Sequence, residues 1–463
     1  MGQADTMGHR PVRASAMTPK ASAHRAHNAG LHRPGPAMTT IRSLIVLALA
    51  LAGCTQAPDP TPAPRPTEAP ATAATGVKVT PWTLPVDRGA AQPDLVRAPD
   101  GALLMSWIEP LAKGHALRLA RYVDGAWTAP RTIAQGEDWF VNWADTPHVQ
   151  ATADGALWAH WLRRSAAAPY AYDVVLSRST DGGARWSTPT PVNDDGTPTE
   201  HGFVSMWAAS DTGIGIAWLD GRHTADGVHD AAAGHGDGAM TLRTAMFDAQ
   251  LQRSAETELD ASTCDCCQTD VAMTPRGALV VYRDRTAEEI RDIAVTRLDG
   301  GAWTAPRMVH ADGWRMPACP VNGPAMAARA DRVVVGWYTE AGGLPMVRVA
   351  TSDDAGDRFG PPREIARGAQ VLGRVAVAWA GDAAWISWLQ EADDVQSLWV
   401  ARLPSDPAQA HAPVRVATLV GRGRGTGVPQ LVASGSQLHL AWTDVEAGAP
   451  RLRGAVIGMA GTP

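Results

Sequence analysis

The 463-residue sequence lacks an excess of basic residues, a sustained helical pattern and, beyond residue 53, an apolar run long enough to cross a membrane. Its 41 Lys and Arg are outnumbered by 47 Asp and Glu, which gives a formal net charge of −6. This balance argues against nucleic-acid binding, which needs a basic stripe. The 45 Gly, 35 Pro and 18 Trp are instead typical of short strands joined by turns. We therefore predict an all-β protein.

The first 75 residues differ in composition from the rest of the chain. Residues 1–37 have no apolar periodicity, and we interpret them as a mis-called start. Residues 38–53 combine a basic residue, a short apolar run and small residues directly before Cys54. This segment resembles a bacterial lipoprotein signal, which implies lipidation of the Cys54 thiol. Residues 54–75, rich in Pro, Ala and Thr, predict an extended linker.

These features predict an exported monomer attached to the outer membrane through its lipid anchor alone. It would face either the periplasm or the cell surface. The alternative is a plain secretory signal without lipidation.

A pattern of about 50 residues recurs seven times between residues 76 and 460. Each copy has an apolar strand, a turn, a strand ending in an aromatic residue, and further strands. The aromatic position holds Trp107, Trp161, Trp218, Tyr282, Trp337, Trp388 and Trp442. About four strands repeated at this period predict a β-propeller. We predict seven blades, with six as the alternative if the first or third repeat is irregular.

The seventh repeat has only three strands of its own. Residues 76–84 read as a strand and are predicted to supply the fourth. An N-terminal strand placed there would close the ring and cover two sheet edges at once.

Two turns share a motif of the form Ser-x-Asp-x-Gly-x-x-Trp, at residues 179–186 and, with Phe in the last place, at 352–359. On this Asp-box motif, residues 76–460 resemble the sialidase-like Asp-box propellers, also called the BNR-repeat family. The resemblance implies a structural role, in the turn between the third and fourth strands of a blade, for Ser179, Asp181, Gly183, Trp186, Ser352, Asp354, Gly356 and Phe359.

The unusual residues concentrate on one face of the predicted ring, where the loops between blades and the loops after second strands meet. We predict a polar pocket there that accepts an anion, because arginine binds carboxylates through paired hydrogen bonds. The alternative is that charged residues simply suit strand ends. The predicted ligand-binding residues are Arg222, Arg283, Arg285, Arg291, Arg374, His201 and Trp314.

The resemblance to sialidases implies an arginine clamp, a tyrosine nucleophile assisted by a glutamate, and an aspartate acid/base. The chain has only five tyrosines, however, and lacks the family's Arg-Ile-Pro segment. Tyr282 takes an aromatic core position, whereas Tyr338 could reach the mouth. The predicted catalytic residues are Asp220, Asp284, Glu340 and Tyr338.

The function predicted from these residues is glycan-directed, as an exo-sialidase-like glycoside hydrolase that acts on, or binds, an anionic sugar. One alternative is a propeller that serves binding or assembly without catalysis. The other is a periplasmic protein that binds a metal through its cysteines.

Four cysteines, Cys264, Cys266, Cys267 and Cys319, fall on two neighbouring loops. As disulfides, Cys319 joins one of the other three, and we expect the remaining two to be one or two residues apart in a strained ring. As thiolates, together with His310 or His201, they could instead hold copper or zinc. The third possibility is that they stay free thiols.

Overall fold

The computed structural model describes residues 76–224, 238–406, 409 and 411–459. The predicted start, signal segment, Cys54 and linker lie outside these residues, so they stay predictions, as do the cellular location and the monomeric state. Among the described residues, no helix has the length and apolar character needed to cross a bilayer.

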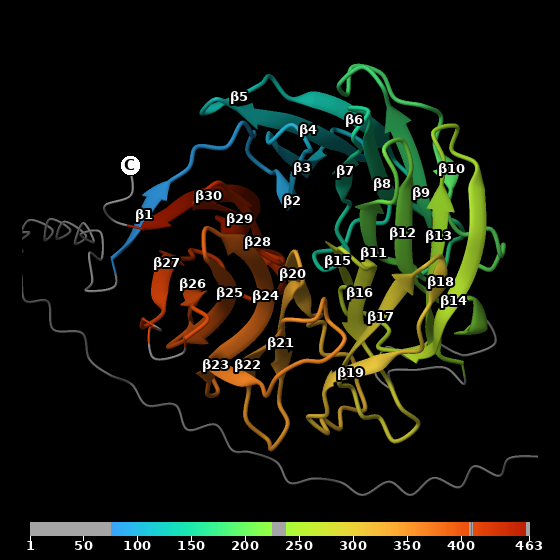
Figure 1. Cartoon of the computed structure of the whole chain (residues 1–463). Helices are drawn as coiled ribbons and strands as arrows, with labels where there is room; N and C mark the ends of the chain where they lie inside the picture. The colour runs from blue at the N-terminus through green and yellow to red at the C-terminus, as the bar shows by residue number, and fades with distance from the viewer. Residues whose placement is uncertain (1–75, 225–237, 407–408, 410, 460–463) are drawn as a thin grey trace, which may run out of the picture. The chain divides into compact units, whose positions relative to one another are not determined.

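Seven antiparallel sheets surround a common centre, which confirms the predicted seven-bladed propeller (Figure 1). Blade 1 contains β2 (Ala91–Arg97), β3 (Leu103–Pro110), β4 (His115–Val123), β5 (Ala126–Trp127) and β6 (Arg131–Gly136). Blade 2 contains β7 (Val149–Ala151), β8 (Leu157–Arg164), β9 (Tyr172–Ser179) and β10 (Thr190–Pro191). Blade 3 contains β11 (His201–Ala208), β12 (Ile214–Asp220), β13 (Met240–Phe247) and β14 (Arg253–Thr263).

The remaining blades follow the same order. Blade 4 contains β15 (Asp270–Thr274), β16 (Gly277–Arg283), β17 (Ile293–Asp299), β18 (Ala302–Trp303) and β19 (Arg307–His310). Blade 5 contains β20 (Ala325–Arg329), β21 (Arg332–Thr339), β22 (Met346–Ser352) and β23 (Arg363–Arg367). Blade 6 contains β24 (Val371–Ala380), β25 (Ala383–Ala392), β26 (Val395–Leu403) and β27 (Val414–Thr418). Blade 7 contains β28 (Gln430–Ser434), β29 (Gln437–Glu446), β30 (Ala449–Met459) and β1 (Val77–Pro81).

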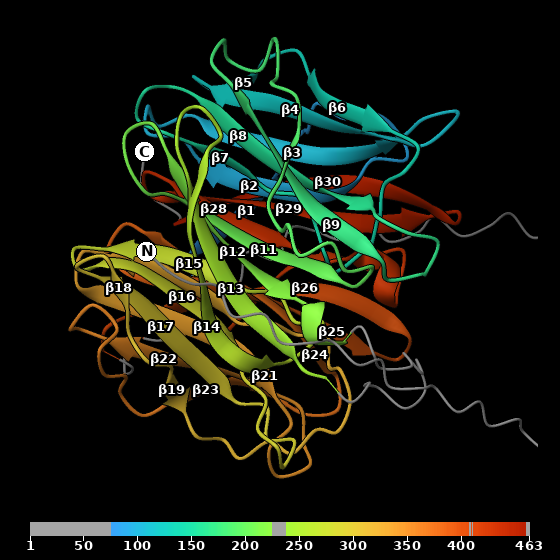
Figure 2. The ribbon, with the colours of Figure 1, turned by 90° about the vertical axis from the view of Figure 1, so that its right-hand side faces the viewer.

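The core is divided among the seven interfaces between neighbouring blades. Each of seven clusters of buried apolar residues draws most of its members from two adjacent blades. Seen from the side, neighbouring sheets pack against one another around the wall of the ring (Figure 2). Because both faces of every sheet are covered in this way, the second strands read as almost continuous apolar runs.

The repeated aromatic position lies on the second strand of every blade. All seven side chains are buried, from 0% exposed at Trp107 to 6% at Trp442. The polar edge of a buried indole needs an acceptor. Trp107 donates to Glu109 at 2.7 Å, and Trp218 donates to Asp220 at 2.8 Å. The repeat was therefore visible in the sequence because it marks the core.

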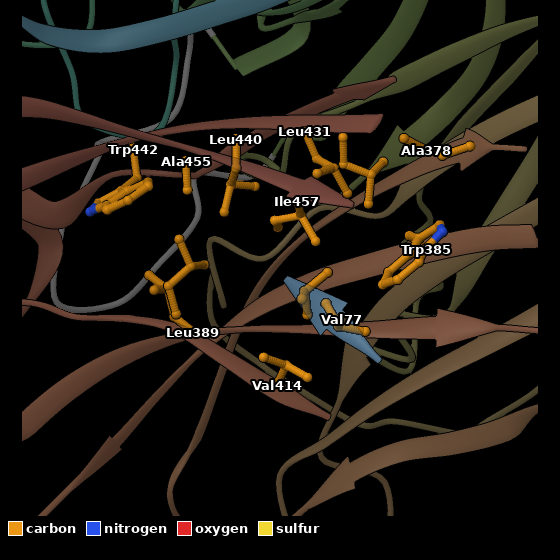
Figure 3. Packing of buried hydrophobic residues seen from close by; sticks show 14 of the residues in the cluster. Val77, Ala378, Trp385, Leu389, Val414, Leu431, Leu440, Trp442, Ala455 and Ile457 are labelled. Atoms are coloured by element: carbon orange, nitrogen blue, oxygen red, sulfur yellow. The ribbon is translucent and has the colours of Figure 1, made fainter. Parts of the chain in front are cut away.

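The ring closes as predicted, through the N-terminal strand. β1 pairs with β30 over five residue pairs, from Val77 with Met459 to Pro81 with Ala455. Figure 3 shows Val77 in one cluster with Trp385 of blade 6 and Ile457 of blade 7. β1 thus completes blade 7 and also fills the interface with blade 6.

The two motif turns follow β9 and β22 and carry the same hydrogen bonds. The Ser179 hydroxyl donates to Asp181 at 3.0 Å and accepts from the Gly183 N–H at 2.9 Å. In the second turn, Ser352 donates at 2.7 Å to the carboxylate two residues later and accepts from the Gly356 N–H at 2.9 Å. These bonds stay within each turn, which agrees with the structural role expected of the motif.

Candidate functional site

The opposite face, here called the mouth, is formed by the loops between blades (residues 137–148, 194–200, 264–269 and 311–324) and the loops after second strands (165–171 and 284–292). An isolated β-bridge between Ile290 and Arg315 joins the two kinds of loop. The Met316 N–H also donates to the Glu289 carbonyl at 2.9 Å. The prediction that these loops share one face is therefore confirmed.

A channel of about 280 Å³ lies at the centre of the ring and is lined by the first strand of every blade. Its acidic side chains connect neighbouring blades. Asp94 accepts the Val149 N–H at 2.9 Å, and Asp270 accepts the Met326 N–H at 2.7 Å. None of the residues that line the channel is an arginine. The channel walls therefore do not provide the expected anion clamp.

Arg283, a predicted ligand-binding residue, is buried between blades 4 and 5 with 2% of its surface exposed. Its guanidinium donates to the main-chain carbonyls of Asn322 (2.8 and 3.1 Å), Arg291 (2.6 Å) and Tyr338 (2.8 Å). It also lies 4.9 Å from the centre of the Trp314 ring. These contacts place Arg283 and Trp314 in the packing between the two blades, and a role for either residue in ligand binding stays a prediction.

The other four arginines also have internal partners. Arg222 forms a fork on Asp220, with both N–O distances 2.7 Å. Arg285 and Arg291 both contact Glu289, at 2.7 and 2.8 Å. Arg374 donates to the carbonyls of Gly423 and Gly427 and lies 4.6 Å from the Trp143 ring centre. The described residues show no shared clamp among them, and a role for these arginines in ligand binding stays a prediction.

Asp220, a predicted catalytic residue, belongs to a buried ion network with His201 and Asp195. The His201 Nε2 atom lies 3.0 Å from Asp195 and 3.7 Å from Asp220, and its Nδ1 atom lies 3.0 Å from the Tyr172 carbonyl. Burial lowers the pKa of His201, but the two carboxylates outweigh it and raise that pKa. Burial raises the pKa of Asp220, but the hydrogen bonds from Arg222 and the charge of His201 outweigh it, so the pKa is lowered. Asp220 is therefore ionised and poorly suited to donate a proton.

This network also brings three possible metal-ligand atoms together, from Asp195, His201 and Asp220, all within 4.8 Å of one another. The Arg222 guanidinium already lies 2.7 Å from Asp220 and 3.7 Å from Asp195. The positive charge beside these two carboxylates is therefore the Arg222 guanidinium, and the arrangement is explained without a metal ion.

The remaining predicted catalytic residues lie in blades 4 and 5. Asp284 is half-buried, and burial together with the charge of Asp260 raises its pKa to about 6. Tyr338 is buried edge-on against Trp314, 5.7 Å between ring centres. Burial and the neighbouring Glu340 raise the pKa of Tyr338. This tyrosine is therefore neutral, and with 8% of its surface exposed it is buried; its role in catalysis stays a prediction.

A second tyrosine–carboxyl group, which sequence reasoning missed, lies between blades 2 and 3. The Tyr172 hydroxyl donates to Glu200 at 2.6 Å and lies 3.3 Å from an oxygen of Asp145. We call these three residues the acid cluster. A Cβ atom at Gly202 would lie 2.0 Å from Asp145, so the approach of these groups requires glycine there. Asp145 also lines the central channel, which places the cluster between the channel and the mouth.

Both carboxyl groups of the acid cluster hold protons unusually strongly. Burial, with a further contribution from the charges of Asp145 and Asp265, raises the pKa of Glu200 to about 8 despite its hydrogen bond from Tyr172. Burial raises the pKa of Asp145 to about 7, although the hydrogen bond from the Phe203 N–H lowers it. Glu200 as a residue is half-buried, and its carboxyl group keeps its proton at neutral pH.

Aromatic side chains lead from the surface to this cluster. Phe140 stacks on Tyr172 with ring centres 3.9 Å apart and planes inclined by 9°. Tyr170, 42% exposed, lies 6.2 Å from Phe140. The exposed Arg164 guanidinium lies 5.6 Å from the centre of the Phe140 ring. Such rings offer apolar faces on which a sugar ring could pack.

The acid cluster predicts a pH dependence of stability. Because the pKa of Glu200 rises from its ordinary 4.5 to about 8 on folding, the folded protein binds a proton that the unfolded chain releases between these values. The free energy of unfolding should therefore fall as pH rises through this window. Glu200→Gln should flatten this decline, measured by urea unfolding at pH 5 and pH 8. The matched control is the exposed Glu288→Gln; equal pH dependence in wild type and Glu200→Gln would contradict the assignment.

The four cysteines lie together at the mouth. Cys266 and Cys319 form a disulfide that joins the loops before and after blade 4. Cys264 and Cys267 are buried free cysteines, with sulfur atoms 2.7 Å apart. We expected the two cysteines outside this disulfide to be one or two residues apart, and this was wrong. Cys319 bonds to Cys266, the middle one of the three, so the two that remain, Cys264 and Cys267, are three positions apart.

The sulfur atoms of Cys264, Cys267 and Cys319 lie within 4.8 Å of one another and could hold a metal ion. Neither histidine proposed as a further ligand belongs to this group. His201 is enclosed by the blade 3 ion network, and His310 lies 3.7 Å from Asp312.

No protein-family model and no curated protein matches the sequence. Among solved structures, a protein of unknown function from Dyadobacter fermentans DSM 18053 is similar with a TM-score of 0.48 and 14% identity, over 83% of this chain and 99% of that one. The polysaccharide lyase Uly1 has a TM-score of 0.48 and 10% identity, over 80% and 90% of the two chains. A NanB sialidase variant from Streptococcus pneumoniae has a TM-score of 0.42 and 10% identity, over 82% and 70%. At such identities the similarity says nothing about what this chain binds.

Proposed function

We propose that the propeller is glycan-directed and acts on a carbohydrate at the mouth, with Glu200 as the proton donor. The observation that supports this most strongly is the carboxyl group of the half-buried residue Glu200, which accepts a hydrogen bond from the buried Tyr172 hydroxyl at 2.6 Å and has a pKa raised to about 8. Cleavage of a glycosidic bond needs an acid that is still protonated at neutral pH, to protonate the departing oxygen. Burial supplies that property here.

Tyr172 and Asp145 would position this acid. The Tyr172 hydroxyl is held by Glu200 at 2.6 Å, and burial with the neighbouring carboxyl groups raises the pKa of Tyr172 further. A neutral, fully buried hydroxyl is a poor nucleophile, so Tyr172 serves as a hydrogen-bond donor that orients Glu200. The exposed Tyr170 and the half-buried Phe140 would pack against the sugar ring.

The finer form of the proposal is an exo-sialidase-like hydrolase that takes an anionic sugar. Arg164 supports this form, because its exposed guanidinium lies beside Phe140 at the entrance to the acid cluster. A guanidinium in this position would pair with the carboxylate of the sugar.

A screen of the purified protein against neutral, uronate-containing and sialate-containing oligosaccharides tests the proposal. We expect an acidic oligosaccharide to bind, and Tyr170→Ala and Arg164→Ala each to weaken binding about 10-fold. Lys113→Ala, an exposed cation in a loop of blade 1, is the matched control. Binding of neutral glycans alone would refute the anionic form, and no binding of any glycan would refute the proposal as a whole.

A second candidate function is the binding of copper or zinc. The observation that favours it is the approach of three cysteine sulfur atoms within 4.8 Å. Thiolates are the ligands that Cu(I) and Zn²⁺ prefer in proteins. Elemental analysis of the fully reduced protein, after exposure to each metal and desalting, should find about one ion per chain; Cys264→Ser should lose it.

A further inference from the structure

One sulfur atom takes part in two arrangements that exclude each other. Cys319 is bonded to Cys266, and its sulfur also lies 4.0 Å from that of Cys264, within the three-sulfur group. A metal ion is bound by a thiolate, and a sulfur in a disulfide has no thiolate to offer. While the disulfide exists, the group is therefore short of one ligand.

We propose that the Cys266–Cys319 disulfide gates a site for one soft metal ion and that its reduction opens the site. The proposal rests on the second candidate function above. An external dithiol supplies the two electrons: the Cys266–Cys319 bond breaks, two thiols form, and the dithiol becomes a disulfide. The metal ion then displaces the protons of the Cys264, Cys267 and Cys319 thiols, which pass to the solvent.

The burial of the four cysteines suits this order of events. Cys264 and Cys267 are 1% and 2% exposed, whereas Cys266 and Cys319 are only half-buried at the mouth. An external reductant therefore meets the disulfide first. The two ligands beneath it are shielded from reagents in the solvent.

The distances are close to those of a thiolate site. A Zn–S distance of about 2.3 Å puts the sulfur atoms of a tetrahedral site about 3.8 Å apart. The 4.0 Å between Cys264 and Cys319 agrees with this edge. The 2.7 Å between Cys264 and Cys267 must widen by about 1 Å, which needs only small side-chain rotations within one loop.

The surroundings also balance the charge that such a site would carry. Three thiolates exceed the charge of a monovalent or divalent ion. The guanidinium groups of Arg283 and Arg291 interact electrostatically with Cys264 and Cys267. Arg291 already pairs with Glu289, whereas the printed hydrogen bonds of Arg283 go to main-chain carbonyls, so Arg283 would compensate part of the surplus negative charge.

The test is a zinc titration of the full chain against a competing chelator, before and after reduction by a dithiol that is then removed without oxygen. A copper(I) titration repeats it. All proteins carry Cys54→Ser, so the thiol count under denaturing conditions should rise from two to four. We expect one ion per reduced chain and at least 100-fold weaker binding by the disulfide form.

Two variants separate gating from metal binding. Cys266→Ser frees Cys319 permanently, so it should bind the ion without reduction, provided that a count of three thiols shows no new pairing with Cys264. Cys319→Ser should not bind in either state. Circular dichroism checks that both variants fold.

Each other outcome has a definite meaning. Equal affinity in the disulfide and reduced forms, or a need for reduction in Cys266→Ser with three free thiols, would overturn the gate while metal binding stands. No stoichiometric binding in the reduced wild type would overturn the second candidate function and the gate together.

Discussion

Replacement of Arg283 by methionine is expected to lower the free energy of unfolding by about 3 kcal/mol or more, because three buried main-chain carbonyls would lose a donor and each such loss costs about 1–3 kcal/mol. The carbonyls of Arg291, Asn322 and Tyr338 would lose the hydrogen bonds that this guanidinium donates. A buried carbonyl without a donor costs about 1–3 kcal/mol. Methionine keeps much of the side-chain volume, so the loss would come from hydrogen bonding and not from a cavity.

Urea unfolding followed by circular dichroism measures this effect. Arg422→Met is the control, because that arginine is half exposed and pairs with Glu391 and Asp394 at the surface. Its removal should cost less than about 1 kcal/mol. Unchanged stability in Arg283→Met, together with loss of glycan binding, would return Arg283 to the ligand-binding role that the sequence predicts for it.

Glu200→Gln is expected to lower turnover of the glycan identified in the binding screen by at least about 100-fold, with binding nearly unchanged. Glutamine keeps the shape and can still bond to the Tyr172 hydroxyl, but it has no proton to donate. In the wild type, kcat/KM should fall as pH rises through about 8, where the carboxyl group ionises. This fall of kcat/KM at high pH should be absent in Glu200→Gln.

Asp284→Asn provides a matched comparison, because that carboxyl group is also half-buried with a raised pKa but lies outside the acid cluster. It should change turnover by less than about 10-fold. A larger loss in Asp284→Asn than in Glu200→Gln would move the proton donor to blade 4. Full activity in both variants would rule out either carboxyl group as the donor.

The fold could be predicted from the sequence because its physical requirement repeats. Each blade must bury an aromatic side chain on its second strand, so the same residue type recurs at similar spacing from Trp107 to Trp442. The seventh repeat likewise lacks a fourth strand, so its sheet has one unpaired edge. Residues 77–81 are the segment that was left to pair with that edge.

The candidate site could be predicted only in part, because a sequence does not show where a charged group points. Arg283 looks the same in sequence whether it faces a ligand or main-chain carbonyls, and only the packing of blade 5 decides this. The acid cluster has no motif: Asp145, Tyr172 and Glu200 come from three segments and meet only in the folded ring. The disulfide partner of Cys319 was also undetermined, because three cysteines lie within four positions.

The pairing of β1 with β30 also bears on how the protein is made. Thr80 and Val456 are neighbours in one sheet although they are 376 positions apart. The other six sheets pair strands that are close in sequence, so each can form soon after its segment is synthesised. β1 therefore cannot pair until β30 has been synthesised. A chain that ends before residue 449 has no β30 to pair with β1, so blade 7 and the ring can close only after β30 has been synthesised.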